Sequence, residues 1–141
     1  MNLRPLTRHD IETLPLPGLD PMRGHAAELC EIGKGFVVEQ DGEAIAIGGI
    51  SQLWRGVGEA WVLASSIEMP VKFHRLAKRV IHDLAREMGI HRVHVHSFAT
   101  DTRVHRWLEL LGFEREGKRK GWFFDGRDAI AFALLFPKNL R

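Results

Sequence analysis

The sequence contains no tyrosine, only one cysteine and no long apolar run. The single cysteine, Cys30, cannot form an internal disulfide, which indicates a protein of a reducing compartment. The longest apolar run covers residues 129–136, far short of the roughly 20 residues that a bilayer span needs. The first six residues also lack the apolar stretch of a signal peptide. We therefore expect a cytoplasmic protein with no membrane partner.

The length of the chain indicates its number of domains, and its charge distribution indicates possible partners. A chain of 141 residues is the size of one domain, 1–141, and its 45% hydrophobic residues are enough for a folded core. Residues 1–69 hold 5 Lys or Arg against 10 Asp or Glu, a net −5, whereas residues 70–141 hold 15 against 8, a net +7. Such a basic half is typical of proteins that bind nucleic acid, an anionic membrane or a phosphorylated small molecule, and also of ordinary solvated helix faces.

Apolar periodicity and turn residues predict the element order β-α-α-β-β-β-α-β-α-β-β. Thr7, three residues before Asp10, predicts a capping box at the start of a helix over 8–14. A second helix is expected over 22–32. The pair Asp41-Gly42 predicts a tight hairpin, and Gly48 and Gly49 are expected at a bulge.

The second half of the chain alternates helices and strands. The most regular helix is expected over 70–88, because apolar residues recur there at three- and four-residue steps: Phe73, Leu76, Ala77, Val80, Leu84 and Met88. A strand follows over 90–97, and then a helix that Thr102 can cap and Gly112 can end. The last hairpin is expected to pair 122–124 with 129–136 across the turn Asp125-Gly126. This order indicates one α/β (α+β) domain with a mixed, mainly antiparallel sheet flanked by helices.

Three local motifs resemble the acetyl-CoA-dependent N-acetyltransferase superfamily known as GNAT. They are Leu3-Arg4-Pro5-Leu6-Thr7 followed by Asp10, Leu110-Leu111-Gly112-Phe113, and Glu114-x-Glu116-Gly117. In that superfamily the motifs belong to the first strand and helix, the end of the last helix, and the final hairpin. The resemblance implies a GNAT fold and transfer of an acyl group from acetyl-CoA to a primary amine.

Four further segments are similar to a phage-encoded branch of GNAT-like proteins that includes an internal virion protein. They are Ala46-Ile47-Gly48-Gly49, Ala60-Trp61-Val62-Leu63, Arg106-Trp107-Leu108 and Asp125-Gly126-Arg127-Asp128. This narrower resemblance implies a second function class. The fold would then serve as a non-catalytic structural or interaction protein of a phage particle, with a protein partner and a place in the virion.

The GNAT resemblance also implies where acetyl-CoA binds. The pantetheine arm would pair with a strand at Val62, Leu63 and Ala64. The pyrophosphate would lie at the start of the following helix, where free N–H groups attract anions. The superfamily carries Arg/Gln-x-x-Gly-x-Gly/Ala there, and this chain has Met69, Lys72 and His74 at the three positions. Both glycines are absent, so phosphate contact falls to the side chains of Lys72, His74 and Arg75, with Phe73 beside them.

The resemblance implies catalytic roles as well. Many members protonate the departing thiolate with a tyrosine whose position is held here by Leu108, so His105 or Cys30 would have to serve as the acid. The general base is often a carboxylate on the strand that binds pantetheine, and Glu59 is the candidate, with Glu68 the other acid of that stretch. A glutamate at a strand start is equally typical of a solvated sheet edge.

Two other groups of residues suggest different chemistry. His94 and His96 share a strand face with Arg92 and could bind a divalent metal, but zinc needs a third ligand and the sequence offers no second cluster at ligand spacing. We therefore expect no metal site.

The basic run 118–120 precedes Trp122 and Phe123, a pattern found in nucleic-acid sites and in basic hairpin loops. Without a recognised motif, we expect no nucleic-acid partner.

Overall fold

The computed structural model describes residues 1–64 and 71–137. The helices are α1 (Arg8–Thr13), α2 (Arg23–Glu31), α3 (Val71–Met88) and α4 (Thr102–Leu110), and a short 3₁₀ turn, η1 (Asp20–Met22), precedes α2. The strands are β1 (Asn2–Pro5), β2 (Gly33–Gln40), β3 (Glu43–Trp54), β4 (Val57–Ala64), β5 (Arg92–Phe98), β6 (Glu114–Arg119) and β7 (Ala129–Leu135). Apart from η1, this is the predicted order of elements.

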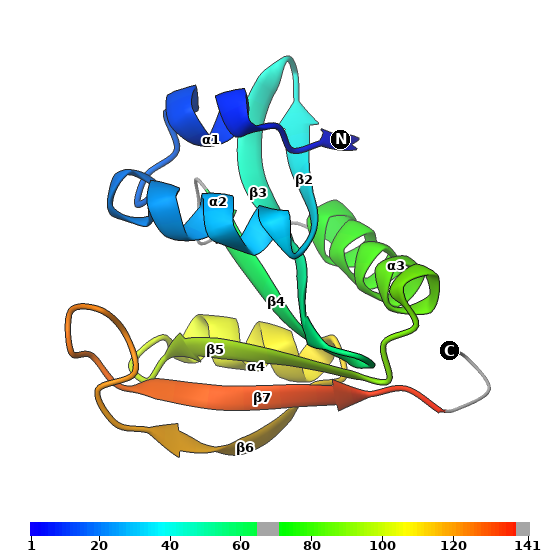
Figure 1. The fold of residues 1–141 in the computed structure, drawn as a ribbon, viewed down its shortest axis with the longest axis vertical. Helices are drawn as coiled ribbons and strands as arrows, with labels where there is room; N and C mark the ends of the chain where they lie inside the picture. The colour runs from blue at the N-terminus through cyan, green and yellow to red at the C-terminus, as the bar shows by residue number, and fades with distance from the viewer. Residues whose placement is uncertain (65–70, 138–141) are drawn as a thin grey trace.

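One mixed sheet runs through the molecule in the order β1-β2-β3-β4-β5-β7-β6. Only β4 and β5 pair in parallel, and the other neighbours are antiparallel. Helices α1 and α2 lie in front of β2, β3 and β4, whereas α4 lies behind β5 (Figure 1). The single mixed sheet flanked by helices confirms the predicted fold class. None of the described helices is both long and apolar enough to cross a bilayer.

Two apolar cores form on opposite faces of the sheet. Because side chains alternate along a strand, the neighbours Val37 and Val38 face opposite ways. Val37 packs in a cluster with Leu16 and Leu19 from the segment between α1 and α2. Val38 belongs to the larger core that α3 and α4 complete with Phe73, Leu84, Trp107 and Leu108.

The capping box at α1 is present as predicted. The Thr7 hydroxyl accepts a hydrogen bond from the Asp10 amide, and the Asp10 carboxylate accepts one from the Thr7 amide at 2.9 Å. Asp10 also accepts two hydrogen bonds from the Arg4 guanidinium, at 2.7 and 2.8 Å. These bonds to Arg4 outweigh the effect of burial and hold the pKa of Asp10 well below its usual range. The first strand and first helix are thereby tied together.

Helix α3 packs its predicted apolar face on the sheet. Phe73, Leu84 and Ala85 are buried, and Leu76 and Val80 are half-buried against the same core. Gly89, with a φ of 67°, ends the helix as expected.

Replacing Leu84 by alanine should lower the free energy of unfolding by about 2–5 kcal/mol, because it leaves a cavity in a close-packed core. Leu84 is only 3% exposed. Denaturant unfolding of the variant measures the loss. The exposed Lys78→Ala on the same helix is the control and should change stability by less than about 0.5 kcal/mol. An equally small effect at Leu84 would contradict the assigned face.

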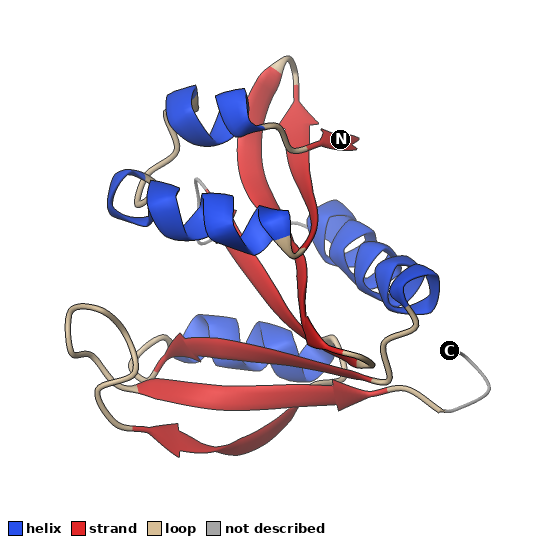
Figure 2. Cartoon of the chain, viewed as in Figure 1, coloured by secondary structure: helices blue, strands red, loops and turns tan. Residues whose placement is uncertain are grey.

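The predicted final hairpin is wrong in its first strand. The strand that pairs with β7 is β6, and residues 120–128 form a loop between them (Figure 2). Asp125 and Gly126 do form a turn, since the Gly126 amide donates to the carbonyl of Phe123 at 2.8 Å and Gly126 has a φ of 86°. That turn lies inside the loop, because Trp122 and Phe123 pack on side chains of β5 instead of entering a ladder.

The expected bulge at Gly48 and Gly49 is also wrong. Both glycines pair in regular register inside β3, which runs on to Trp54. The irregularities fall between Val38 and Glu39 and between Gln52 and Trp54. These glycines are needed for close approach of the neighbouring strands.

Candidate functional site

Strands β4 and β5 pair over only three positions and then part. The paired residues are Val57 with Arg92, Gly58 with Val93, and Glu59 with His94. Beyond Glu59 the two strands diverge, and the widening gap between them is visible in Figure 1. Along 60–64 the edge of β4 that faces β5 has no strand partner among the described residues. Its backbone N–H and C=O groups are therefore available to a ligand with amide groups.

Val62, Leu63 and Ala64, for which the resemblance implies pantetheine binding, lie on this part of β4. Val62 is the most exposed of the three, at 41%. Leu63 packs against the cluster that contains Leu16 and Leu19, and Ala64 packs against the larger core on the other face of the sheet. All three are small or medium-sized apolar residues on a strand whose other edge is held by β3. The position of this edge is thus fixed by the pairing of β4 with β3.

Glu59 sits at the vertex where the strands part. Its Oε1 lies 2.8 Å from Nδ1 of His96, and the two side chains are 23% and 7% exposed. Burial by itself would raise the pKa of the Glu59 carboxyl, but the hydrogen bond and charge of His96 outweigh it, and the pKa lies below its usual value. The group is therefore an ionised, partly desolvated carboxylate at neutral pH.

His94 completes a cluster with this pair. It stands directly opposite Glu59 in the parallel register, and its ring lies edge-on to that of His96 with centroids 5.4 Å apart. Burial lowers the pKa of His94, which keeps the imidazole neutral. The sequence placed His94 and His96 on one face but did not connect them with Glu59. Only the parallel pairing of β4 with β5 brings the carboxylate next to them.

The loop 120–128 covers the histidine side of the cluster. The Trp122 ring stacks on His96 with centroids 4.1 Å apart and planes 18° apart, and the Phe123 ring lies 4.3 Å from that of Phe98. The Arg127 guanidinium lies over the Phe98 ring, 3.7 Å from its centroid. Trp122, which was considered for stacking on a nucleic-acid base, thus stacks on a side chain of this protein.

The four residues expected at the pyrophosphate lie on two sides of α3. Lys72 and Arg75 line a cavity with Met1 and Arg79. Phe73 and His74 instead face α4, where Trp107 Nε1 donates to His74 Nδ1 at 3.1 Å and the Phe73 ring lies 5.9 Å from that of Trp107. Met69 and Glu68, the other residues considered in this stretch, lie outside the described residues.

His105 is not brought together with Glu59. Its Nε2 donates to the Phe98 carbonyl at 3.0 Å, its Nδ1 lies 3.4 Å from the Arg115 guanidinium, and its ring packs on Phe132. Phe132 alternates along β7 with Ala131 and Ala133, which stand opposite His96 and His94. His105 therefore lies on the other face of the sheet, only 4% exposed and with both ring nitrogens engaged.

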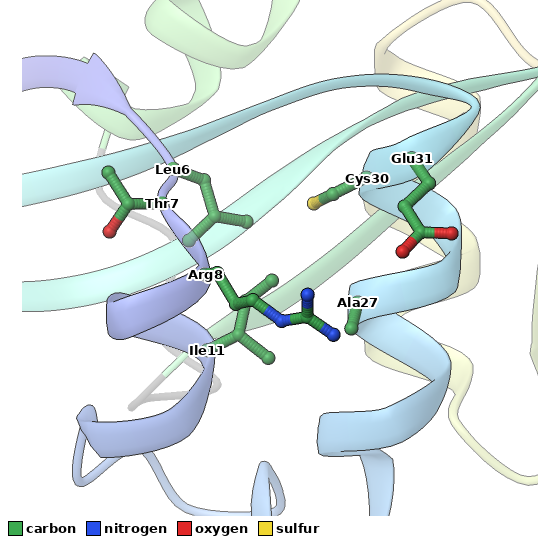
Figure 3. Close-up of a pocket in the computed structure, with 7 residues that line it drawn as sticks. All are labelled: Leu6, Thr7, Arg8, Ile11, Ala27, Cys30 and Glu31. Atoms are coloured by element: carbon green, nitrogen blue, oxygen red, sulfur yellow. The ribbon is translucent and has the colours of Figure 1, made fainter.

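Cys30 lies apart from the cluster, in a cavity of about 150 Å³ between α1 and α2 (Figure 3). The cavity wall is mostly apolar, with Leu6, Ile11 and Ala27 beside the thiol. Burial raises the pKa of Cys30, so the thiol stays protonated at neutral pH. Cys30 has no contact with the gap between β4 and β5.

Comparisons with known proteins agree with this architecture. No protein-family model and no curated protein matches the sequence. Among solved structures, an IAA acetyltransferase from Bacillus cereus ATCC 14579 superimposes with a TM-score of 0.79 at 16% identity, covering 96% of this chain and 99% of that one. A GNAT family acetyltransferase from Elizabethkingia anophelis, with acetyl-CoA bound, gives 0.75 at 16% identity over 96% and 97%. A ribosomal-protein-alanine N-acetyltransferase from Brucella melitensis gives 0.72 at 18% identity over 96% and 100%.

The chain therefore has the fold of the GNAT acetyltransferases, over nearly its whole length. Because the identities are low, this likeness concerns the fold.

Proposed function

We propose that this chain is an acyl-CoA-dependent N-acyltransferase that uses a primary amine as acceptor. The observation that carries the proposal is the gap between β4 and β5, which has a free strand edge on one side and the ionised Glu59 at its vertex. A gap of this kind can hold an extended amide-containing arm while a carboxylate accepts a proton next to it. The acetyltransferases with the same fold support this reading.

Acetyl-CoA would be held by the edge of β4 and the start of α3. The backbone groups of Val62, Leu63 and Ala64 would pair with the pantetheine amides, and Lys72 and Arg75 would supply positive charge to the phosphates. His74 faces α4, where Trp107 donates a hydrogen bond to it. Phe73 is buried and anchors this end of α3 in the core. Bound acetyl-CoA supplies the thioester that the amine attacks.

Glu59 would act on the amine. A primary amine is protonated in neutral water, and it must lose that proton before its nitrogen lone pair can attack the thioester carbonyl. The Glu59 carboxylate would take this proton from the ammonium group. The neutral amine then forms the C–N bond as the C–S bond breaks, and its second N–H proton passes to the departing sulfur, so that CoA leaves as the thiol. His96 holds the carboxylate in place through its ring nitrogen at 2.8 Å and is a positioning residue.

A second function is favoured by the contact between α3 and α4. Trp107, Phe73 and His74 fill the space on that side of the α3 start, and the chain lacks the glycines that let a backbone approach a pyrophosphate. These features favour a non-catalytic protein on the same fold. In that case the chain would be a structural or interaction component of a phage particle, as the narrower sequence resemblance implies.

Calorimetry of the purified chain with acetyl-CoA separates the two functions. The acyltransferase proposal expects binding, weakened by the absent glycines, and release of free thiol when a polyamine or a lysine peptide is added. Lys72→Ala should lower the affinity for CoA but not for pantetheine, which lacks the phosphates, while Lys78→Ala serves as the control. Absence of any heat of binding at millimolar acetyl-CoA would contradict the acyltransferase and leave the structural role.

A further inference from the structure

Glu59, His94 and His96, the three-residue cluster at the vertex, have the arrangement of a metal site. One ligand atom from each side chain lies within 4.8 Å of the other two. Around a tetrahedral ion with bonds of about 2.0–2.2 Å, ligand atoms are about 3.4 Å apart. Small side-chain rotations are enough to reach that spacing. The pairing of β4 with β5 already holds Glu59 opposite His94, and His96 follows two residues later on the same face of β5.

The donor types select the kind of ion. Two imidazoles and one carboxylate suit zinc and its first-row neighbours, whereas magnesium and calcium prefer oxygen ligands alone.

The second nitrogen of His96 is an independent indication of an absent ligand. Nδ1 is engaged by Glu59, but Nε2 is buried and finds no hydrogen-bond partner among the described residues. The His96 side chain is only 7% exposed, so water does not compensate freely. A buried nitrogen without a partner costs free energy, which an ion recovers if it binds at this nitrogen.

The strand next to the histidines, β7, presents small side chains to the cluster. The β7 residues opposite His94 and His96 are Ala133 and Ala131, which are among the smallest side chains. No bulky residue from that strand competes for the space next to the imidazoles. The Trp122 ring, which stacks on His96, comes from a loop and is itself 49% exposed.

We propose that Glu59, His94 and His96 bind one divalent transition-metal ion, with Zn²⁺ the best match, and leave at least one coordination position open for water or a ligand. The site does not depend on acyl transfer. If the proposed function holds, an ion on the Glu59 carboxylate blocks the proton acceptor, and zinc is then an inhibitor that a chelator removes.

The test is titration of the full, chelator-treated chain with Zn²⁺ by calorimetry, without acetyl-CoA. We expect one bound ion per chain. His94→Gln and Glu59→Gln, which keep the size of the side chain, should each weaken binding at least about tenfold. The control is His9→Ala, an exposed histidine on α1, which should leave the affinity unchanged.

Cobalt provides a second measurement that does not rely on variants. Co²⁺ bound by two imidazoles and a carboxylate at low coordination number should show visible absorption bands that Zn²⁺ displaces. Circular dichroism shows whether each variant is folded. Where a variant does not fold, the cobalt spectrum of the native chain tests the proposal instead. Equal zinc affinity in the native chain and in folded His94→Gln, or a cobalt spectrum identical to that of the aqueous ion, would overturn the proposal. Neither result would affect the acetyl-CoA calorimetry, so the two proposals fail separately.

Discussion

Replacing Glu59 by glutamine is expected to lower kcat for amine acylation by about 10²–10⁴-fold, because the amide cannot accept the proton of the amine. The affinity for acetyl-CoA should stay the same, since Glu59 lies at the vertex and not on the free edge of β4. Steady-state kinetics with a chelator present, together with calorimetry, separate these two effects. Glu43→Gln, an exposed carboxylate at the start of β3, is the matched control and should leave kcat unchanged.

The variant His96→Gln tests the same role of Glu59 through the pH dependence of the acylation rate. Without His96, the partly buried Glu59 loses the strongest of the interactions that lower its pKa, while His94 and His25 still lower it, so the pKa should rise toward the value that burial favours. Activity needs the ionised carboxylate, and the acidic limb of the rate profile should therefore move to higher pH. A purely structural role of His96 would reduce the rate without moving that limb. Full activity in Glu59→Gln would show that another group accepts the proton.

Gly49→Ala should destabilise the protein by about 3 kcal/mol or more, or prevent folding. A Cβ at Gly49 would lie 2.0 Å from the Lys34 carbonyl oxygen and 2.8 Å from the Gly35 Cα, both in the backbone of β2. Relief would require the central β2–β3 pair to separate, and backbone atoms cannot rotate away as side chains do.

Gly24→Ala is the matched control for this substitution. Gly24 lies in α2, with nothing within 4 Å of an added Cβ. Alanine is the better helix former, so the variant should be as stable as the native chain or slightly more stable. Denaturant unfolding measures both. A Gly49→Ala variant with native stability would contradict the register of β2 against β3.

Several features of this protein follow from local sequence alone. Thr7 and Asp10 specify the start of α1, because a capping box needs only residues three apart. The apolar spacing of α3 specifies its buried face, and Asp41-Gly42 specifies the β2–β3 turn, where both residues have positive φ. Each of these features depends on residues that are close to one another in the sequence. Glu59 could be named as a candidate base only through the resemblance to the GNAT superfamily, whose base is often a carboxylate on this strand.

Tertiary structure decided the features that depend on distant segments. Glu59 meets His94 and His96 because β4 and β5 pair in parallel, and no local pattern encodes that register. His105 and Glu59 lie on opposite faces of the sheet, although both were reasonable candidates in the sequence. Residues 122–124 look like a strand by composition, yet stacking of Trp122 on His96 draws them into a loop. Burial against a distant partner outweighs local propensity at such positions, and the candidate site is assembled from them.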